Sequence, residues 1–133
     1  MKITFILKGD FEGLPPMLPR LIATAKKGIQ ARLICTKMKK SSRDCLESAN
    51  VVCKETLHTD KFLGRSNRIM DWSGFRRVCR QYLQNDFADS DLLYICSADT
   101  ALCLNALLDK YQYILQSNEL YDQLPMYRNG LKK

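Results

Sequence analysis

Polar side chains stand shortly after three apolar stretches of the sequence, where predicted strands end. Lys8-Gly9-Asp10 follows the first stretch, Asp99-Thr100 the fourth, and Ser117-Asn118-Glu119 the fifth. In open α/β sheets ligands bind at the carboxyl ends of the strands, so we expect these side chains to share one binding surface. The predicted binding residues are Lys8, Gly9, Asp10, Asp99, Thr100, Ser117, Asn118 and Glu119. No catalytic residue and no metal ligand is predicted.

Each of these groups also has a purely structural interpretation. Asp99 is placed to cap the helix that follows it, and Ser117 or Asn118 with Glu119 can cap a terminal helix. Residues 8–13 can form a plain strand-to-helix turn, because their two glycines match neither the dinucleotide-binding fingerprint nor the P-loop. Spacing leaves the structural and the binding interpretations open, and the two are compatible.

The elements that must position these residues alternate between strand and helix. Strands are predicted at residues 2–7, 31–35, 51–55, 92–96 and 113–115, and helices at residues 15–27, 42–48, 66–85 and 100–108. Alternation with short connections indicates right-handed crossovers and a parallel sheet covered on both faces. We therefore expect a single α/β Rossmann-like domain over residues 1–133, in three layers, with about five strands in the order 3-2-1-4-5.

Composition narrows the class of protein without naming a ligand. The 133 residues are 46% hydrophobic and carry a net charge of +7. A basic balance suits nucleic acid, anionic lipid or phosphorylated ligands and does not decide among them. No apolar run approaches 18 residues and the N-terminal stretch is too short for a signal peptide, so a cytoplasmic protein is expected.

Metal binding is disfavoured by the distribution of the possible ligands. The six cysteines form no C-x-x-C pair, and His58 is the single histidine. Five of the cysteines, Cys35, Cys53, Cys79, Cys96 and Cys103, lie in apolar strand or helix positions, as small hydrophobic residues do in a reducing compartment. No cofactor is predicted.

The helix predicted at residues 66–85 has a basic face. Its apolar side follows steps of three and four residues, whereas Arg68, Arg76 and Arg80 lie on the other side. Such a face is usually solvated. The alternative is that it rests on an anionic membrane surface.

The fifth strand and its elbow resemble a known family. Residues 113–121 read Y-I-L-Q-S-N-E-L-Y and are similar to the strand-five elbow, typically Y-D-S-H-E-L-Y, of GT-B-type glycosyltransferases with a glycosyltransferase 4-like N-terminal domain. Gln116 and Asn118 replace the usual Asp and His. Residues 91–102, with their D-T-A-L helix start, and residues 26–31 also resemble that domain.

The resemblance implies a function. In that family two Rossmann-like domains face each other across a cleft, and the N-terminal domain chiefly holds the acceptor while the C-terminal domain binds the nucleotide-sugar. This chain resembles the first domain alone, so it is expected to be inactive by itself. Asp99 and the 117–119 elbow would contact a saccharide or lipid-linked acceptor, since Asp, Asn and Glu bind sugar hydroxyls well.

The implied process is cell-surface polysaccharide or lipopolysaccharide synthesis at the inner face of the membrane, with no nucleic acid partner. The alternative is a self-contained Rossmann-like binding or regulatory module without catalysis.

Overall fold

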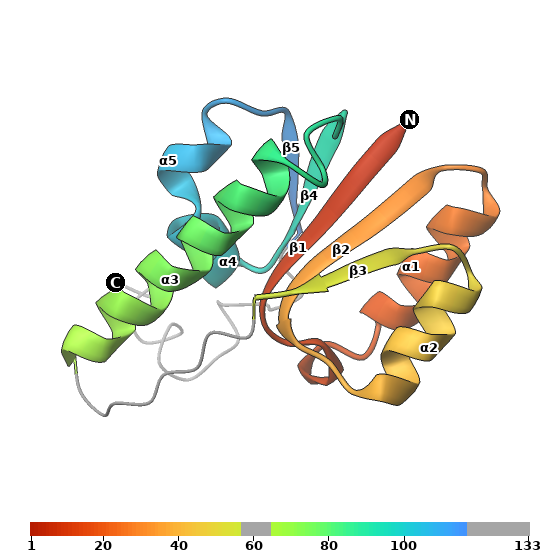
Figure 1. Ribbon diagram of the computed structural model, residues 1–133, viewed down its shortest axis with the longest axis horizontal. Coiled ribbons are helices and arrows are strands. Elements are labelled where there is room, and N and C mark those ends of the chain that lie inside the picture. Colours follow the sequence, from red (N-terminus) through yellow and green to blue (C-terminus); the bar gives the residue numbers. More distant parts are fainter. Residues whose placement is uncertain (57–64, 117–133) are drawn as a thin grey trace, which may run out of the picture.

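A sheet of five parallel strands forms the centre of the protein (Figure 1). The computed structural model describes residues 1–56 and 65–116, and it describes side chains in all of these except 65–71. The strand order is β3-β2-β1-β4-β5, and all neighbours pair in parallel. The strands are β1 (Lys2–Asp10), β2 (Gln30–Lys37), β3 (Val52–Glu55), β4 (Leu92–Cys96) and β5 (Tyr113–Gln116). The predicted fold class and strand order are confirmed.

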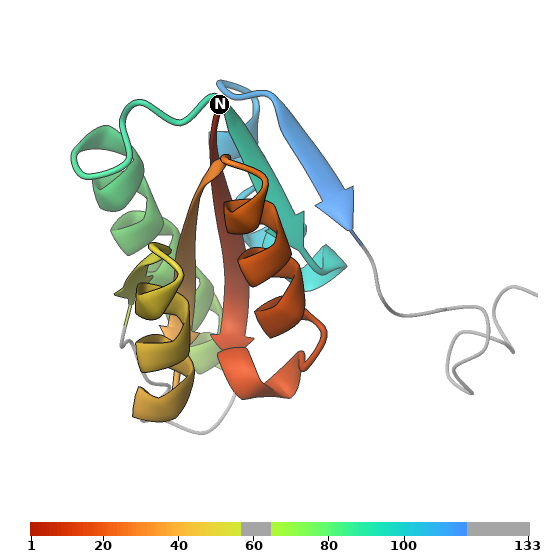
Figure 2. The ribbon, with the colours of Figure 1, turned by 90° about the vertical axis from the view of Figure 1, so that its right-hand side faces the viewer.

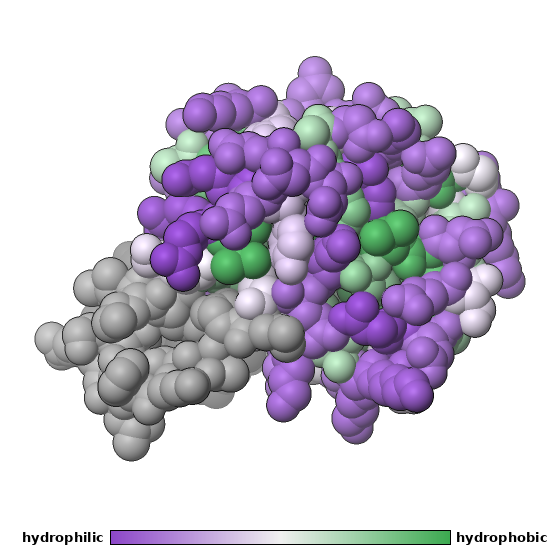
Figure 3. Space-filling model, in the orientation of Figure 1, coloured by the Kyte–Doolittle hydropathy of each residue, from purple (hydrophilic) through white to green (hydrophobic). Residues whose placement is uncertain are grey.

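Helices cover both faces of this sheet. On one face lie α1 (Met17–Lys26) and α2 (Lys40–Ser48), which stand in front of the strands in Figure 2. On the other lie α3 (Arg65–Gln84), α4 (Ala98–Cys103) and α5 (Asn105–Leu108). A short 3₁₀ turn, η1 (Phe11–Gly13), joins β1 to α1. The surface seen in Figure 3 is mainly hydrophilic with small apolar patches.

The sheet is buried on both faces because its central strands are apolar at successive positions. In β1, Phe5 and Leu7 pack toward α1 and α2, whereas Ile6 packs toward α3 and α4. After β3 the chain crosses to the other side of β1, so the direction of the connections reverses between β1 and β4. The predicted binding residues at the carboxyl ends of β1 and β4 therefore lie at this topological switch point.

β1 is longer than predicted, because Lys8, Gly9 and Asp10 continue the strand instead of forming a loop. The extension is irregular, since the pairing with β2 shifts between Leu7 and Asp10. Gly9 has a φ of 140°, a conformation that residues with a side chain rarely adopt. Its N–H donates to the hydroxyl of Thr36 at 2.9 Å, which holds the end of β1 beside β2.

The helix predicted at residues 100–108 is divided, and its cap differs from the prediction. α4 and α5 meet at Leu104, and the side chain of Ser97, not that of Asp99, accepts a hydrogen bond from the first turn. The side chain of Leu102 on α4 is 61% exposed, so one face of this helix is open to solvent. Asp99 is exposed in the first turn of α4, where the positive end of the helix dipole stabilises a carboxylate.

The two edge strands of the sheet are protected to different degrees. The fifth strand is apolar in sequence, yet Tyr113, Ile114 and Leu115 in β5 are each almost half exposed. On β3, by contrast, side chains occupy edge carbonyls: Arg43 donates to Cys53 O at 3.5 Å and Tyr82 to Glu55 O at 2.9 Å. Two edge carbonyls of β3 are thus occupied by neighbouring side chains, although the side chain of Val52 on that strand is also 48% exposed.

All six cysteines lie in the described residues, and five of them are buried as predicted. Burial raises the pKa of Cys35 and of Cys96 to about 12 and that of Cys53 to about 11. Cys45, on α2, is exposed. These three thiols therefore stay protonated at neutral pH and pack as small apolar groups.

Candidate binding site at the carboxyl ends of the strands

Thr100 joins the carboxyl ends of β1 and β4. Its hydroxyl accepts the N–H of Lys8 at 2.9 Å and donates to the carbonyl of Cys96 at 3.1 Å. The residue is fully buried. The structure therefore places this predicted binding residue behind the surface, where it sets the position of the Lys8 backbone.

Ser97 extends this network to β5. Its Oγ lies 2.9 Å from the Thr100 hydroxyl and accepts the Thr100 N–H at 3.3 Å, while its own N–H donates to Gln116 O at 2.9 Å. The Thr100 hydroxyl has one hydrogen, which Cys96 O takes, so Ser97 must donate the hydrogen between the two hydroxyls. The ends of β1, β4 and β5 thus form one connected rim.

The backbone of Ser97 is strained. Its φ of 103° and ψ of 152° fall in a region that is occupied almost only by glycine. Strain of this kind persists where surrounding contacts hold it, as Thr100 and Gln116 do here. Ser97 was not predicted as a site residue, although a serine between an apolar strand and a Thr three residues later is a recognisable helix cap.

A second cluster joins α1 to the same rim. The side-chain oxygen Oε1 of Gln116 accepts hydrogen bonds from Arg20 Nη1 and from the Tyr94 hydroxyl. Tyr94 lies on the face of β4 that packs against α1. Burial raises the pKa of Tyr94, against the opposing effect of Arg20, so its hydroxyl remains a donor at neutral pH. Arg20 and Tyr94 were not predicted, because no local pattern links residues so far apart in the sequence.

The remaining predicted binding residues are only partly brought together. Asp10 and Asp99 are exposed and Lys8 is half-buried, all at the carboxyl ends of β1 and β4. Ser117, Asn118 and Glu119 lie outside the described residues. The neighbouring connections are tied together by Glu12, whose Oε2 accepts the Lys39 N–H at 3.0 Å.

The basic face of α3 is less uniform than predicted. Arg80 is exposed, but Arg76 is half-buried and its Nε donates to the Cys103 carbonyl at 2.7 Å. Arg76 therefore holds α3 against α4 and is not presented to solvent together with Arg80. The side chain of Arg68 lies outside the described side chains. In the part of the chain that the structure describes, no helix combines the length and the apolarity that a membrane crossing requires.

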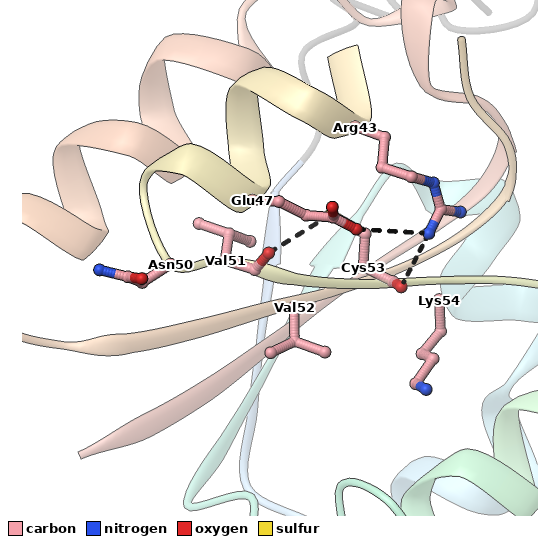
Figure 4. Close-up of a pocket in the computed structure, with 7 residues that line it drawn as sticks. All are labelled: Arg43, Glu47, Asn50, Val51, Val52, Cys53 and Lys54. Atoms are coloured by element: carbon pink, nitrogen blue, oxygen red, sulfur yellow. Dashed lines mark hydrogen bonds and ion pairs between the residues drawn. The ribbon is translucent and has the colours of Figure 1, made fainter. Parts of the chain in front are cut away.

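Three hollows of the described surface adjoin Asn50, just before β3. The one in Figure 4 measures about 460 Å³ and is lined by Arg43, Glu47, Asn50, Val51, Val52, Cys53 and Lys54. Its charges are already paired, since Arg43 contacts Glu55 and lies 3.7 Å from Glu47. Two more hollows of about 450 Å³ also adjoin Asn50. All three hollows lie away from the rim that joins β1, β4 and β5.

Comparison with solved structures finds the same fold in proteins of different function. The calicheamicin glycosyltransferase CalG4 superposes with a TM-score of 0.63 at 12% identity, over 98% of this chain and 36% of its own. The glycotransferase of kitacinnamycin gives 0.66 at 14%, over 98% and 33%. The C-terminal domain of a hydrogenase from Pyrococcus furiosus gives 0.63 at 13%, over 86% of this chain and 90% of that domain. No family model and no curated protein sequence matches the chain.

At these identities the likeness shows the fold alone. The neighbours include glycosyltransferases, so the fold is one that GT-B-like enzymes use, and the chain spans about a third of the length of the two glycosyltransferases. The hydrogenase domain has the same fold, and a fold shared by unrelated activities does not by itself assign one.

Proposed function

We propose that this chain is the N-terminal, acceptor-side domain of a GT-B-type, sugar-nucleotide-dependent glycosyltransferase. The observation that carries the proposal is the superposition of 98% of the chain on each of two glycosyltransferases, with the same chain also bearing the strand-five elbow sequence. The rim that joins β1, β4 and β5 supports it, because the predicted binding residues outside the elbow lie at this rim.

In this proposal the rim forms one wall of a cleft. The Lys8-Gly9-Asp10 segment, Asp99 and the 117–119 elbow contact the acceptor, while Thr100 positions the Lys8 backbone from behind. A second domain supplies the nucleotide-sugar and the other wall. Holding an acceptor hydroxyl against the anomeric carbon can contribute a large part of the rate enhancement. No residue of this chain is assigned to the bond-breaking step, and no metal or cofactor is invoked.

The proposed acceptor is a saccharide or a lipid-linked saccharide of cell-surface polysaccharide or lipopolysaccharide synthesis, met at the cytoplasmic face of the membrane. Arg80, which is exposed on α3, then faces anionic lipid. Replacing Arg80 with Glu is expected to reduce sedimentation with vesicles of phosphatidylglycerol. Sedimentation equal to that of the unaltered protein contradicts the membrane contact and leaves the acceptor role intact.

A second candidate is a self-contained binding or regulatory module without catalysis. It is favoured by the hydrogenase domain, which the chain covers over 90% of its length. The gene distinguishes the two candidates. The transferase proposal expects a second Rossmann-like domain to be encoded after Lys133, and a reading frame that stops there would favour the module.

Binding provides the direct test. Amide chemical shifts of the isolated chain are followed by NMR during titration with a panel of oligosaccharides. Shifts are expected at residues 8–10, 97–100 and 116, and none are expected at residues 30–32 and 89–91, at the amino ends of the strands. The protein extended through the downstream domain should also hydrolyse or transfer from a nucleotide-sugar. A folded, extended protein that is inert toward every common donor contradicts the transferase proposal.

A further inference from the structure

Arg20 carries a positive charge that no carboxylate of the described residues balances. It is half-buried in the first turn of α1, and its contacts are the sulfur of Met17 at 3.8 Å and the amide oxygen of Gln116. Arg32 and Arg43 differ, since Arg32 pairs with Asp89 and Arg43 pairs with Glu55. Arg76 also meets a neutral acceptor, the carbonyl of Cys103. Arg20 is thus fixed in place by a neutral group.

The neutral acceptor fixes the guanidinium without cancelling its charge. An amide oxygen has two lone pairs, and on Gln116 Oε1 these meet Arg20 Nη1 and the Tyr94 hydroxyl. Tyr94 therefore immobilises the amide oxygen that in turn orients Arg20. A pre-oriented guanidinium loses less conformational freedom when it binds a ligand than a free arginine does.

The position in the helix adds to the imbalance. Arg20 stands near the N-terminus of α1, where the helix dipole is positive, and the first turn of α1 contains no acidic residue. A cation is disfavoured there unless an anion accompanies it. Both the side chain and the helix end therefore favour a negatively charged partner.

The site also lies where ligands of this fold bind. Gln116 ends β5, and its carbonyl is tied to Ser97 at the end of β4. Four lysines lie at or just after the carboxyl ends of β1 and β2: Lys8, Lys37, Lys39 and Lys40. They raise the positive potential at this side of the sheet, whereas Asp10 and Asp99 lower it.

We propose that Arg20, oriented by Gln116 and Tyr94, binds a phosphate group of the ligand at the carboxyl end of the sheet. A guanidinium matches carboxylate and phosphate alike, and the net charge of +7 favours the more highly charged anion. The proposal rests on the proposed function only for the molecule that bears the phosphate, because binding of the anion is a property of this chain alone.

Calorimetric titration of the whole chain with inorganic pyrophosphate at constant ionic strength tests the site. We expect saturable binding that Arg20→Gln weakens by about tenfold or more and that Arg20→Lys, which keeps the charge but loses the planar fork, weakens less. The matched control is Arg77→Gln, which removes one exposed positive charge from α3 and should leave the affinity within about twofold. Equal affinities of Arg20→Gln and Arg77→Gln would reject a soluble phosphate ligand at Arg20.

Gln116→Glu separates loss of binding from loss of folding. The new carboxylate would pair with Arg20 and neutralise it in place. We expect the same loss of pyrophosphate affinity as in Arg20→Gln, with a melting temperature at or above that of the unaltered chain. Full affinity in a folded Gln116→Glu variant would count against Arg20 as the anion ligand.

Vesicles identify the source of the phosphate. Sedimentation with phosphatidic acid in phosphatidylcholine is compared with phosphatidylcholine alone, for the unaltered chain, Arg20→Gln and Arg77→Gln. Arg20-dependent binding of pyrophosphate supports a soluble phosphate ligand, and Arg20-dependent binding of the acidic vesicles alone supports a lipid-borne one. No Arg20 dependence in either arm overturns the proposal. Failure of the oligosaccharide titration with intact pyrophosphate binding would reject the proposed function and keep this site.

Discussion

The guanidinium of Arg32 lies 2.7 Å from the carboxylate of Asp89, and this pair ties the loop before β4 to the amino end of β2. Arg32 is buried, donates to Ser90 Oγ at 2.7 Å and lies 4.8 Å from the ring centre of Phe87. Asp89 also contacts Lys2 Nζ at 2.5 Å. Ion pairs therefore join the elements at the amino end of the sheet, whereas hydrogen bonds of the Ser97 and Thr100 hydroxyls join the strands at the carboxyl end, where the candidate site lies.

Asp89 should make stability depend on pH in acid. Hydrogen bonds from Lys2 and Arg32 lower the pKa of Asp89 to about 2. A carboxyl whose folded pKa lies below its unfolded value of about 3.9 contributes stability that is complete above the unfolded value and is lost as the pH falls toward the folded one. Asp89→Asn is thus expected to lower the melting temperature at pH 6 and to make less difference at pH 2.

The control for this prediction is Asp44→Asn, which removes a carboxylate that is exposed on α2 and forms no ion pair within the described residues. Its melting temperature should follow that of the unaltered chain at both pH values. An Asp89→Asn deficit that is the same at pH 6 and at pH 2 contradicts the assignment.

Ser97 should respond to substitution in an unusual order. Alanine removes the helix cap, which costs about 1 kcal/mol, and keeps the strained backbone. Glycine also removes the cap but adopts a φ of 103° without strain. Ser97→Gly should therefore be more stable than Ser97→Ala in urea unfolding. The reverse order would mean that the backbone is relaxed in solution.

Thr100 should act on β1 through one hydrogen bond. Thr100→Val keeps the shape of the side chain but removes the hydroxyl that accepts the backbone N–H of Lys8. Loss of this hydrogen bond is expected to lower the free energy of unfolding by about 1–3 kcal/mol. Thr100→Ser keeps the hydroxyl and should cost less. Hydrogen exchange of the Lys8 amide is the specific measurement, because it should accelerate in Thr100→Val and not in Thr100→Ser. Unchanged exchange in both variants would show that another group protects this amide.

The exposed strand β5 should make the isolated chain self-associate. An edge strand with open apolar side chains pairs readily with another chain, and a charge on it prevents this. Ile114→Lys is expected to reduce the dimer and larger species seen by sedimentation velocity at rising concentration. Val52→Lys on β3 is the matched control, since that edge is already occupied by Arg43 and Tyr82. Equal effects of the two variants would remove β5 as the cause.

The strand order was predictable because each strand is an apolar run and the crossovers between parallel strands have one hand. The state of β5 was not, because Tyr113, Ile114 and Leu115 suit a central strand as well as an edge strand. The cap of α4 was misplaced by two residues, since Ser97 and Asp99 are both good capping residues and only the backbone direction after Cys96 chooses between them.

The candidate site was predictable in part for the same reasons. Lys8 and Asp10 reach the rim because they lie at the end of β1, and Asp99 because it follows β4. Arg20 and Gln116 meet across the sheet through packing of α1, and no spacing rule anticipates a contact between side chains 96 positions apart. Thr100 was recognised as a site residue, but its burial behind Lys8 depends on how α4 docks.

The unequal burial of the cysteines allows thiol labelling to report on unfolding of the protein. Cys45 is open to solvent while the other five thiols are enclosed, so a maleimide pulse on the native chain should add one label and a pulse on the unfolded chain six. Mass spectrometry of the intact protein then counts folded and opened molecules in a single spectrum. Because Cys96 ends β4 beside the rim, the rate at which its thiol becomes labelled should fall when a ligand holds that rim closed.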